Sequence, residues 1–195
     1  MPITVELIKK LRDLTGAGVN DIKDALEEAK GNEAEALTIL RKKGQKIAAK
    51  RAEKATNEGL VEAYVHSNGK LGVLVAVACE TDFVARTDEF KSFVHELALQ
   101  VAATNPSFIK PDEVPVEDVE KEKEIYRDQL KTEGKPEAMW DKIIEGKLQK
   151  YYSEICLLKQ IYVKDDKMTI EKMLEALVAK FGENIQIKKI ERVTL

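Results

Sequence analysis

Hydrophobic positions in the first 45 residues follow the period of an α-helix, in three short segments. Thr4 is expected to cap the first helix, which Gly16 ends. Asn20 or Asp21 begins the second helix, and Asn32 caps the third. The apolar faces of the three predicted helices comprise Leu7, Ile8, Leu11 and Leu14; Ile22, Ala25, Leu26 and Ala29; and Ala36, Leu37, Ile39 and Leu40.

Residues 1–45 are therefore predicted to form a three-helix N-terminal module, with Gly44 ending the third helix. A core of this size is marginally stable alone, so the module either docks onto a partner or caps and stabilises the main domain. Residues 46–58, rich in alanine and lysine, are expected to form a linker helix. A basic run of this kind suits a nucleic-acid or ribosome contact, but it lacks aromatic residues for base stacking, which favours a solvated connector.

Beyond residue 58 the hydrophobic period changes from helical to alternating. Residues 60–66 alternate, and the following Asn68-Gly69 is a strong signal for a hairpin turn. The returning strand, residues 71–78, is apolar on both faces. We therefore expect both faces to be covered, by helices or by another chain.

This strand ends in Cys79-Glu80-Thr81-Asp82-Phe83-Val84-Ala85-Arg86, and the rest of the chain is organised around that stretch. A large aromatic residue thus stands on the turn between a strand and a helix. Phe83 either folds back to complete the core or remains exposed for a partner. Asp82 either contacts that partner or caps the helix, and the two roles are compatible. The helix that follows has Phe90, Phe93, Val94, Leu97, Ala98 and Val101 on one face.

The second half of the chain is predicted to continue with helices. Three prolines mark a loop over residues 105–115, and a highly charged, exposed helix is expected over residues 116–131. Pro136 precedes another helix. Its apolar stripe comprises Met139, Trp140, Ile143, Ile144, Leu148 and Tyr151 or Tyr152.

The last segments complete the predicted fold. Thr169 is expected to cap a further helix, and residues 185–193 form a strand whose alternation slips near Lys189, which indicates a bulge. Together these patterns predict an α+β fold. In it, residues 59–195 form a core of antiparallel sheet packed with helices.

Composition narrows the function. The chain has 195 residues and a net charge of −3, so it lacks the basic excess of a general nucleic-acid binder. Cys79 and Cys156 lie far apart without a nearby histidine pair, which indicates reduced thiols rather than a disulfide or a zinc site. The N-terminal pattern is not that of a signal peptide, and no run approaches about 18 apolar residues, so no membrane span is expected. No catalytic motif appears, so we expect neither an enzyme nor a bound metal or cofactor.

Two stretches resemble the signatures of the bacterial elongation factor Ts family. The first is Leu11-Arg12-Asp13-Leu14-Thr15-Gly16-Ala17-Gly18-Val19, followed by Lys23 and Ala25-Leu26, and the second runs from Cys79 to Arg86. The separation of the signatures and the basic linker are also similar. The C-terminal stretches that match are Val163-Lys164-Asp165-Asp166 and Phe181-Gly182-Glu183-Asn184-Ile185. The resemblance covers the whole chain, in the short form that lacks the inserted coiled coil of longer members.

This resemblance implies a guanine nucleotide exchange factor for the translational GTPase elongation factor Tu. In the family, the aromatic residue of Thr-Asp-Phe-Val wedges between two helices of the GTPase and dislodges its magnesium. The matching residues in this chain are Thr81, Asp82, Phe83 and Val84. The residues that match an N-terminal docking surface are Arg12, Gly16 and Val19.

The resemblance also implies an N-terminal bundle like a ubiquitin-associated domain and a cytoplasmic protein. The expected partners are elongation factor Tu, in its GDP-bound and nucleotide-free states, and a second copy of the chain that pairs through the C-terminal region. Direct contact with nucleic acid or membrane is not expected. Two departures stand out: Ala76 and Ala78 replace an acidic residue and an asparagine, and Val19 and Asn20 replace the methionines of some members.

Two other classes of protein fit parts of the sequence. A ribosome- or nascent-chain-associated binding protein would suit the N-terminal helices and the basic run, and it would bind ribosomes while ignoring the GTPase. A small metal or acid–base enzyme would use the many carboxylates for catalysis. Exposed charged helices, however, explain the same composition without any catalytic role for these residues. Release of labelled GDP from elongation factor Tu distinguishes these classes.

Overall fold

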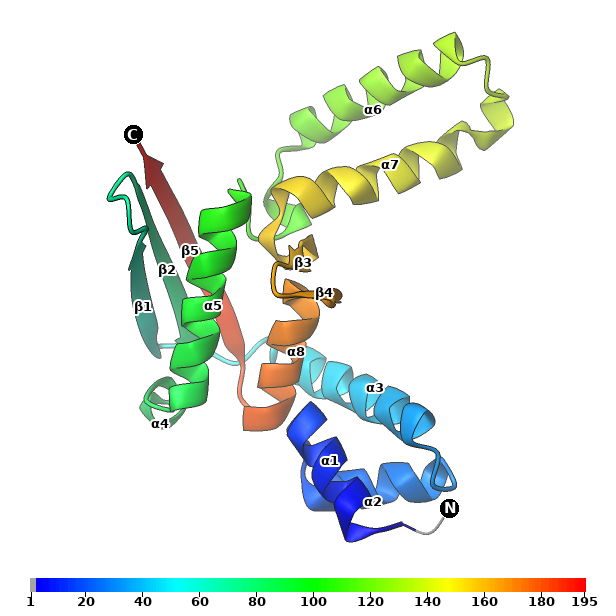
Figure 1. The fold of residues 1–195 in the computed structure, drawn as a ribbon. Coiled ribbons are helices and arrows are strands. Elements are labelled where there is room, and N and C mark those ends of the chain that lie inside the picture. The colour runs from blue at the N-terminus through cyan, green and yellow to red at the C-terminus, as the bar shows by residue number, and fades with distance from the viewer. Residues whose placement is uncertain (1–2) are drawn as a thin grey trace.

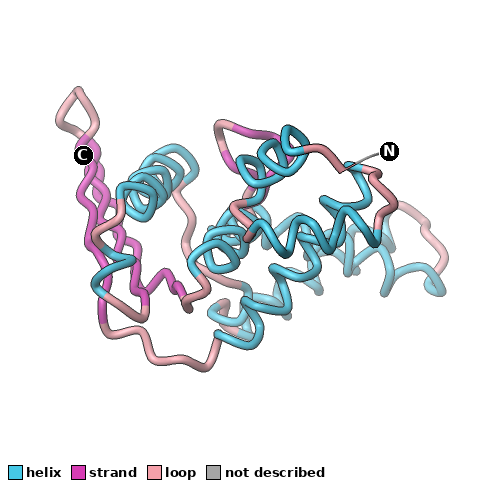
Figure 2. Tube along the Cα trace, turned by 90° about the horizontal axis from the view of Figure 1, so that it is seen from below, coloured by secondary structure: helices cyan, strands magenta, loops and turns pink. Residues whose placement is uncertain are grey.

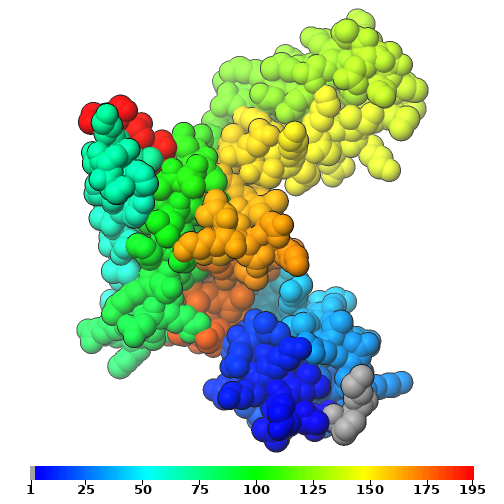
Figure 3. All heavy atoms as spheres, viewed as in Figure 1, coloured from blue at the N-terminus to red at the C-terminus, as the bar shows by residue number. Residues whose placement is uncertain are grey.

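The computed structural model describes residues 3–195, so the first two residues of the predicted N-terminal module lie outside it. The fold is α+β, as predicted. Three parts are visible in Figure 1: a helical module at the N-terminus, a core of sheet and helices, and a long helical arm. The space-filling view shows the module and the arm as two separate projections from the core (Figure 3).

The N-terminal module contains α1 (Val5–Thr15), α2 (Val19–Glu28) and the first half of α3 (Glu33–Arg51). Thr4 caps α1 and Asn32 caps α3, as predicted. Helix α2 begins at Val19, slightly earlier than predicted, because Gly18 takes the N-cap position. The module has its own small core, formed by Leu11, Ile22, Ala25, Leu26, Ala29, Ala36 and Leu40.

The prediction that Gly44 ends the third helix is wrong, because α3 continues through Gly44 to Arg51. Gly44 lies where α3 packs against α8 (Ile170–Phe181), and a Cβ at position 44 would lie 3.1 Å from that of Ala179. The glycine therefore permits a close approach of two helices and does not act as a stop. The first part of the predicted linker helix is the end of α3, and residues 52–57 form an irregular connection.

A three-stranded antiparallel sheet forms the centre of the core. Its strands are β1 (Glu58–Val65), β2 (Leu71–Cys79) and β5 (Ile185–Thr194), in the order β1-β2-β5. The predicted hairpin joins β1 to β2, and Gly69 in its turn has a positive φ of 67°. The predicted bulge near Lys189 is also present, since Ala76 pairs with Lys189 whereas Val77 pairs with Ile187.

One face of this sheet is packed and the other is open. Helix α5 (Asp88–Thr104) lies across the sheet with its predicted apolar face fully inward, and α8 packs beside it. All the long helices lie on this side (Figure 2). The expectation that β2 would be covered on both faces is therefore wrong within the single chain. Leu74 is 50% exposed, and Val61, Val65 and Val193 are exposed on the same open face.

The arm is a helical hairpin, formed by α6 (Val116–Thr132) and α7 (Trp140–Ile155). Its small separate core comprises Leu130, Ile144 and Leu148, and most of the predicted stripe packs between the two helices. Met139 is the exception, because it lies in the 3-10 turn before α7 and is exposed. Besides α4, which is described below, the remaining elements are short. They are the 3-10 helices η1 (Pro111–Glu113), η2 (Glu137–Met139) and η3 (Leu157–Lys159), and a hairpin of β3 (Ile161–Tyr162) and β4 (Asp165–Thr169). None of the helices within residues 3–195 is long and apolar enough to cross a membrane.

Candidate partner-binding site

Phe83 lies on a projecting corner of the core. It belongs to α4 (Asp82–Ala85), a single helical turn between β2 and α5, and its side chain is 79% exposed. Phe90, seven residues later, is completely buried. An exposed aromatic ring of this size leaves apolar surface in water, which the hydrophobic effect disfavours. Of the two sequence-based interpretations, the structure excludes a core role for Phe83.

Two threonine caps define the corner. Thr81 Oγ1 accepts a hydrogen bond from Val84 N (3.4 Å) and caps α4, while Thr87 Oγ1 accepts one from Phe90 N (3.2 Å) and caps α5. The cap of α4 is thus Thr81 and not Asp82, which corrects the alternative considered from the sequence. Asp82 instead forms an i,i+4 ion pair with Arg86 (3.0 Å). Because Arg86 is largely exposed and Asp82 partly exposed, this pair contributes little to stability.

The four matched residues of the second signature differ in accessibility. Val84 is only 7% exposed and anchors the corner in the core, whereas Phe83 points outward. The Thr81 hydroxyl is occupied within the chain, since it donates to Glu183 Oε1 at 2.7 Å. Asp82 keeps a partly exposed carboxylate. The corner therefore offers one ring and one carboxylate to a partner, and its other two residues hold them in place.

Cys79 lies under the corner. Its thiol is buried and donates to the carbonyl of Thr81 at 3.1 Å. Burial, and then the nearby Glu183 carboxylate, raise the pKa of the Cys79 thiol above its ordinary value. The thiol is therefore neutral at physiological pH and fills space beneath the turn.

The N-terminal candidate residues lie at the same end of the molecule as the corner. Arg12 and Val19 are exposed on the module, and Gly16 is the left-handed C-cap of α1 with φ 66°. In Figure 1, α4 and the C-terminal end of α1 lie on opposite sides of the lower end of α8. The structure thus brings the two predicted groups to one end of the molecule without direct contact between them.

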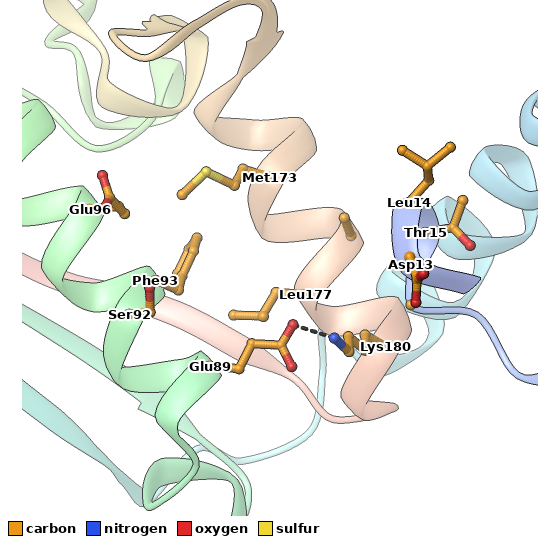
Figure 4. Close-up of a pocket in the computed structure, with 12 residues that line it drawn as sticks. Asp13, Leu14, Thr15, Glu89, Ser92, Phe93, Glu96, Met173, Leu177 and Lys180 are labelled. Carbon is orange, nitrogen blue, oxygen red and sulfur yellow. Dashed lines mark hydrogen bonds and ion pairs between the residues drawn. The ribbon is translucent and has the colours of Figure 1, made fainter. Parts of the chain in front are cut away.

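A cleft of about 350 Å³ separates the module from the core at this end. Figure 4 shows Leu14 and neighbouring residues of α1 facing α5 and α8 across it. Lys180 of α8 pairs with Glu89 at the start of α5, and the aliphatic part of Lys180 packs against Gly16. Neither Arg12 nor Val19 lines this cleft.

The sequence analysis did not predict the surroundings of two residues in this region. Leu14 was placed on the inward face of α1, but it is 61% exposed and lines the cleft between the module and the core. Glu183 was assigned only to a C-terminal motif, yet it binds Thr81, 102 residues earlier. Its position directly after the helix-ending Gly182 indicated a turn but could not indicate which segment that turn meets.

The described residues offer no evident site for a metal. Within residues 3–195, no group of three or more histidine, cysteine, aspartate or glutamate side chains is arranged to hold a metal ion. The geometry of the corner instead suits contact with another macromolecule, since an exposed apolar side chain on a fixed backbone is typical of an interface anchor.

Comparison with known proteins assigns the family. The family model described as elongation factor TS matches residues 5–177. Elongation factor Ts of Syntrophus aciditrophicus is 50% identical over 195 residues, covering 100% of this chain and 97% of that protein. Elongation factor Ts of Thermotoga maritima is 52% identical over 192 residues (98% and 96%), and that of Fervidobacterium nodosum is 50% identical over 195 residues (100% and 99%). The chain belongs to the elongation factor Ts family.

Proposed function

We propose that this protein is a guanine nucleotide exchange factor for elongation factor Tu, and that Phe83 inserts between helices of the GTPase domain. The observation that carries the proposal is the 79% exposed ring of Phe83 on a corner whose neighbours are anchored in the core. Membership of the elongation factor Ts family supports the exchange role in general. The partner is bound in both its GDP-bound and its nucleotide-free states.

The wedge need not touch the nucleotide. GDP in a GTPase is held largely by its magnesium ion and by backbone amides around the phosphates. Displacing the elements that carry these groups dislodges the magnesium and weakens the binding of GDP. Thr81, Asp82 and Val84 contribute by fixing the ring and by placing one carboxylate beside it.

Reciprocity sets the energetic requirement. A factor that binds the nucleotide-free GTPase more tightly than the GDP-bound form lowers the affinity for GDP by the same factor. Each tenfold change needs ~1.4 kcal/mol, and burial of one Phe side chain supplies roughly 1.5–3 kcal/mol. Phe83 alone therefore does not account for a large acceleration, and further contacts must contribute.

We place part of those further contacts on the N-terminal module. Residues 1–45 form the docking module, residues 46–58 connect it to the core, and residues 59–195 carry the corner. Arg12, Gly16 and Val19 contribute to the docking surface, with Leu14 beside them. The module's exposed aliphatic side chains and its position at the same end of the molecule as Phe83 support this assignment.

We also propose that the protein forms a homodimer through its C-terminal region. The C-terminal strand β5 lies at an edge of the sheet and carries the exposed Val193, and the open face beside it includes Leu74 of β2 and Val61 and Val65 of β1. An open apolar face of this kind is typical of an interface. Sedimentation that shows only monomer at tens of micromolar protein would contradict this part of the proposal.

We further propose that the protein acts in the cytoplasm. It carries out no chemical reaction of its own, needs no cofactor and binds a protein rather than nucleic acid or membrane directly. The net charge of −3 and the family membership support these statements.

Release of labelled GDP from elongation factor Tu tests the proposal. We expect strong acceleration by the wild-type chain and at least a tenfold smaller effect with Phe83→Ala, because the variant loses an anchor worth more than ~1.4 kcal/mol. Val116→Ala, which shortens an exposed apolar side chain on the distant arm, is the matched control and should act like the wild type.

Circular dichroism must show that both variants are folded. A folded Phe83→Ala variant with full exchange activity would remove Phe83 from the mechanism. A wild-type chain that binds ribosomes and leaves GDP release unchanged would favour the ribosome- or nascent-chain-associated class instead.

A further inference from the structure

The end of the β2–β5 ladder carries an unusual exchange of carboxylates. The last backbone pair is Cys79 with Ile185. Immediately beyond this pair, the segment after β2 and the segment before β5 each place a glutamate against the backbone of the other. Glu183 Oε2 accepts from Thr81 N at 3.0 Å, and Glu80 Oε1 accepts from Asn184 N at 2.6 Å. Two side-chain carboxylates thus extend the ladder where the backbones diverge.

Glu183 also controls the cap of α4. The Thr81 hydroxyl donates its proton to Glu183 Oε1 at 2.7 Å, which leaves the oxygen's lone pairs free to accept from Val84 N. A single hydroxyl can fill both roles only if its proton points away from the helix. Because the acceptor is a carboxylate, the bond from the hydroxyl is of the strong, charge-assisted kind.

The same cluster fixes a third segment, the end of α3. The Asn184 side-chain amide donates to the carbonyls of Ala52 (3.2 Å) and Lys54 (2.7 Å), and Asn184 is almost fully buried. Arg51 pairs with Glu80 Oε2 at 3.3 Å. The corner, the start of β5 and the connection from the N-terminal module therefore meet at one set of hydrogen bonds.

A one-turn helix such as α4 is not stable by its own hydrogen bonds. Its conformation depends on the cap and on what holds the cap. If the turn were mobile, inserting Phe83 into a partner would require ordering the backbone on binding, and the lost entropy would subtract from the binding energy. A fixed turn avoids this loss.

We propose that Glu183 is a positioning residue for Phe83. Through both of its oxygens it holds Thr81 and thereby keeps α4 in the conformation that presents the ring. The effect of Glu183 on GDP release rests on the proposed exchange function. That Glu183 holds α4 in place can be tested without the GTPase.

Whether Glu183 holds α4 in place is tested in the free protein by ¹⁵N relaxation. We expect the backbone order parameter of Phe83 to be near 0.85 in the wild type and below about 0.6 in Glu183→Ala. Leu97, within α5, should stay rigid in both. The matched control is Glu191→Ala, which removes an exposed carboxylate of β5 that pairs only with Lys189 within the described residues. An order parameter that stays near 0.85 in Glu183→Ala would overturn the proposal.

Whether Glu183 affects GDP release through Phe83 is tested by a double-mutant cycle on GDP release from elongation factor Tu. We expect Glu183→Ala to slow the stimulated release about tenfold, since it removes two hydrogen bonds to a charged acceptor. In the Phe83→Ala background the same change should cost less than about twofold, because the ring through which Glu183 acts is gone. A tenfold loss that persists in that background would show that Glu183 acts elsewhere and would overturn the proposal.

Two further outcomes separate the possible failures. If the wild type does not accelerate GDP release, the proposed function fails, while the relaxation data still decide whether Glu183 holds the corner. If Glu183→Ala does not fold, Glu183→Gln takes its place, since it keeps the side-chain length and one acceptor oxygen. That variant should show a roughly threefold loss, and wild-type values in both measurements would overturn the proposal.

Discussion

The Phe83 corner and the N-terminal module present apolar surface in two different ways. The corner offers one aromatic ring on a turn that is held by its cap and by Glu183, and Glu80 binds the segment that carries Glu183. The module offers several aliphatic side chains, including Leu14 and Val19, on a bundle with a small core. The module is attached through the packing of α3 on α8 and through few other contacts.

This difference separates two tasks that a nucleotide exchange factor must perform. A contact made equally well with the GDP-bound and the nucleotide-free GTPase adds affinity but does not change the affinity for GDP. Only a contact made better with the nucleotide-free form does so. A rigid wedge that needs space between two helices suits the second task, and a broad aliphatic surface suits the first. We therefore expect the corner to govern the rate of GDP release and the module to govern affinity.

The largest expected effect contrasts two aromatic rings of the corner region. Phe90→Ala should lower the free energy of unfolding by about 3–5 kcal/mol, because it leaves a cavity beneath the sheet. Phe83→Ala should change it by less than about 0.5 kcal/mol, because its ring is already in water. Urea unfolding followed by circular dichroism measures both. A large loss of stability in Phe83→Ala would mean that the ring packs within its own chain in solution.

The second prediction tests the module. The double variant Leu14→Ala, Val19→Ala should weaken binding to the GTPase by about 2 kcal/mol, or roughly thirtyfold, since two aliphatic side chains lose partial burial. The rate of GDP release at saturating factor should stay within about twofold of the wild type. Phe83→Ala should show the opposite pattern, with a lower saturated rate. A lower rate of GDP release at saturating module variant would contradict the idea that the module governs affinity and the corner governs the rate.

The third prediction concerns the junction between the two regions. Gly16 has φ 66°, and a Cβ there would lie 2.4 Å from Cδ of Lys180. Gly16→Ala should therefore cost about 1–2 kcal/mol of stability, mostly from the left-handed backbone, because the Lys180 side chain can move aside. Gly146→Ala, a helical position with open space around it, is the control and should be neutral or stabilising. Equal stability of both variants would contradict the strain assigned to the left-handed backbone at Gly16.

The sequence predicted local structure best where neighbouring residues alone determine it. The caps at Thr4, Asn32 and Thr169, the hairpin at Gly69 and the bulge near Lys189 all follow from neighbouring residues, and all are present. Gly44 was misread because its meaning depends on α8, more than a hundred residues later. The open face of β2 was misread because an apolar strand does not reveal whether its cover belongs to the same chain.

The candidate site shows the same limit. The sequence identified the stretch that carries Phe83 but left open whether its ring is buried, since both an inward and an outward aromatic residue fit a turn between a strand and a helix. What holds the ring outward is a contact between Thr81 and Glu183 across 102 positions, and no local pattern reports such a contact. The prediction for Leu14 was wrong because the helical period of α1 does not show whether a side chain faces the module's own core or an open cleft.

The smallest expected effect uses pH to separate the corner from the module. The pKa of the buried Cys79 thiol is raised, mainly by burial, from an ordinary value of 9.0, and residues 1–45 contain no cysteine. As pH rises above about 9, the unfolded chain releases a thiol proton that the folded chain retains, so the free energy of unfolding falls. Cys79→Ala should flatten this decline between pH 8 and 10 in urea unfolding. Cys156, whose pKa burial raises to about 11, contributes a decline of the same sign that Cys79→Ala leaves in place. An identical slope in the wild type and in Cys79→Ala would show that the space beneath the corner admits water and that the corner is less firmly held than the contacts of Thr81 indicate.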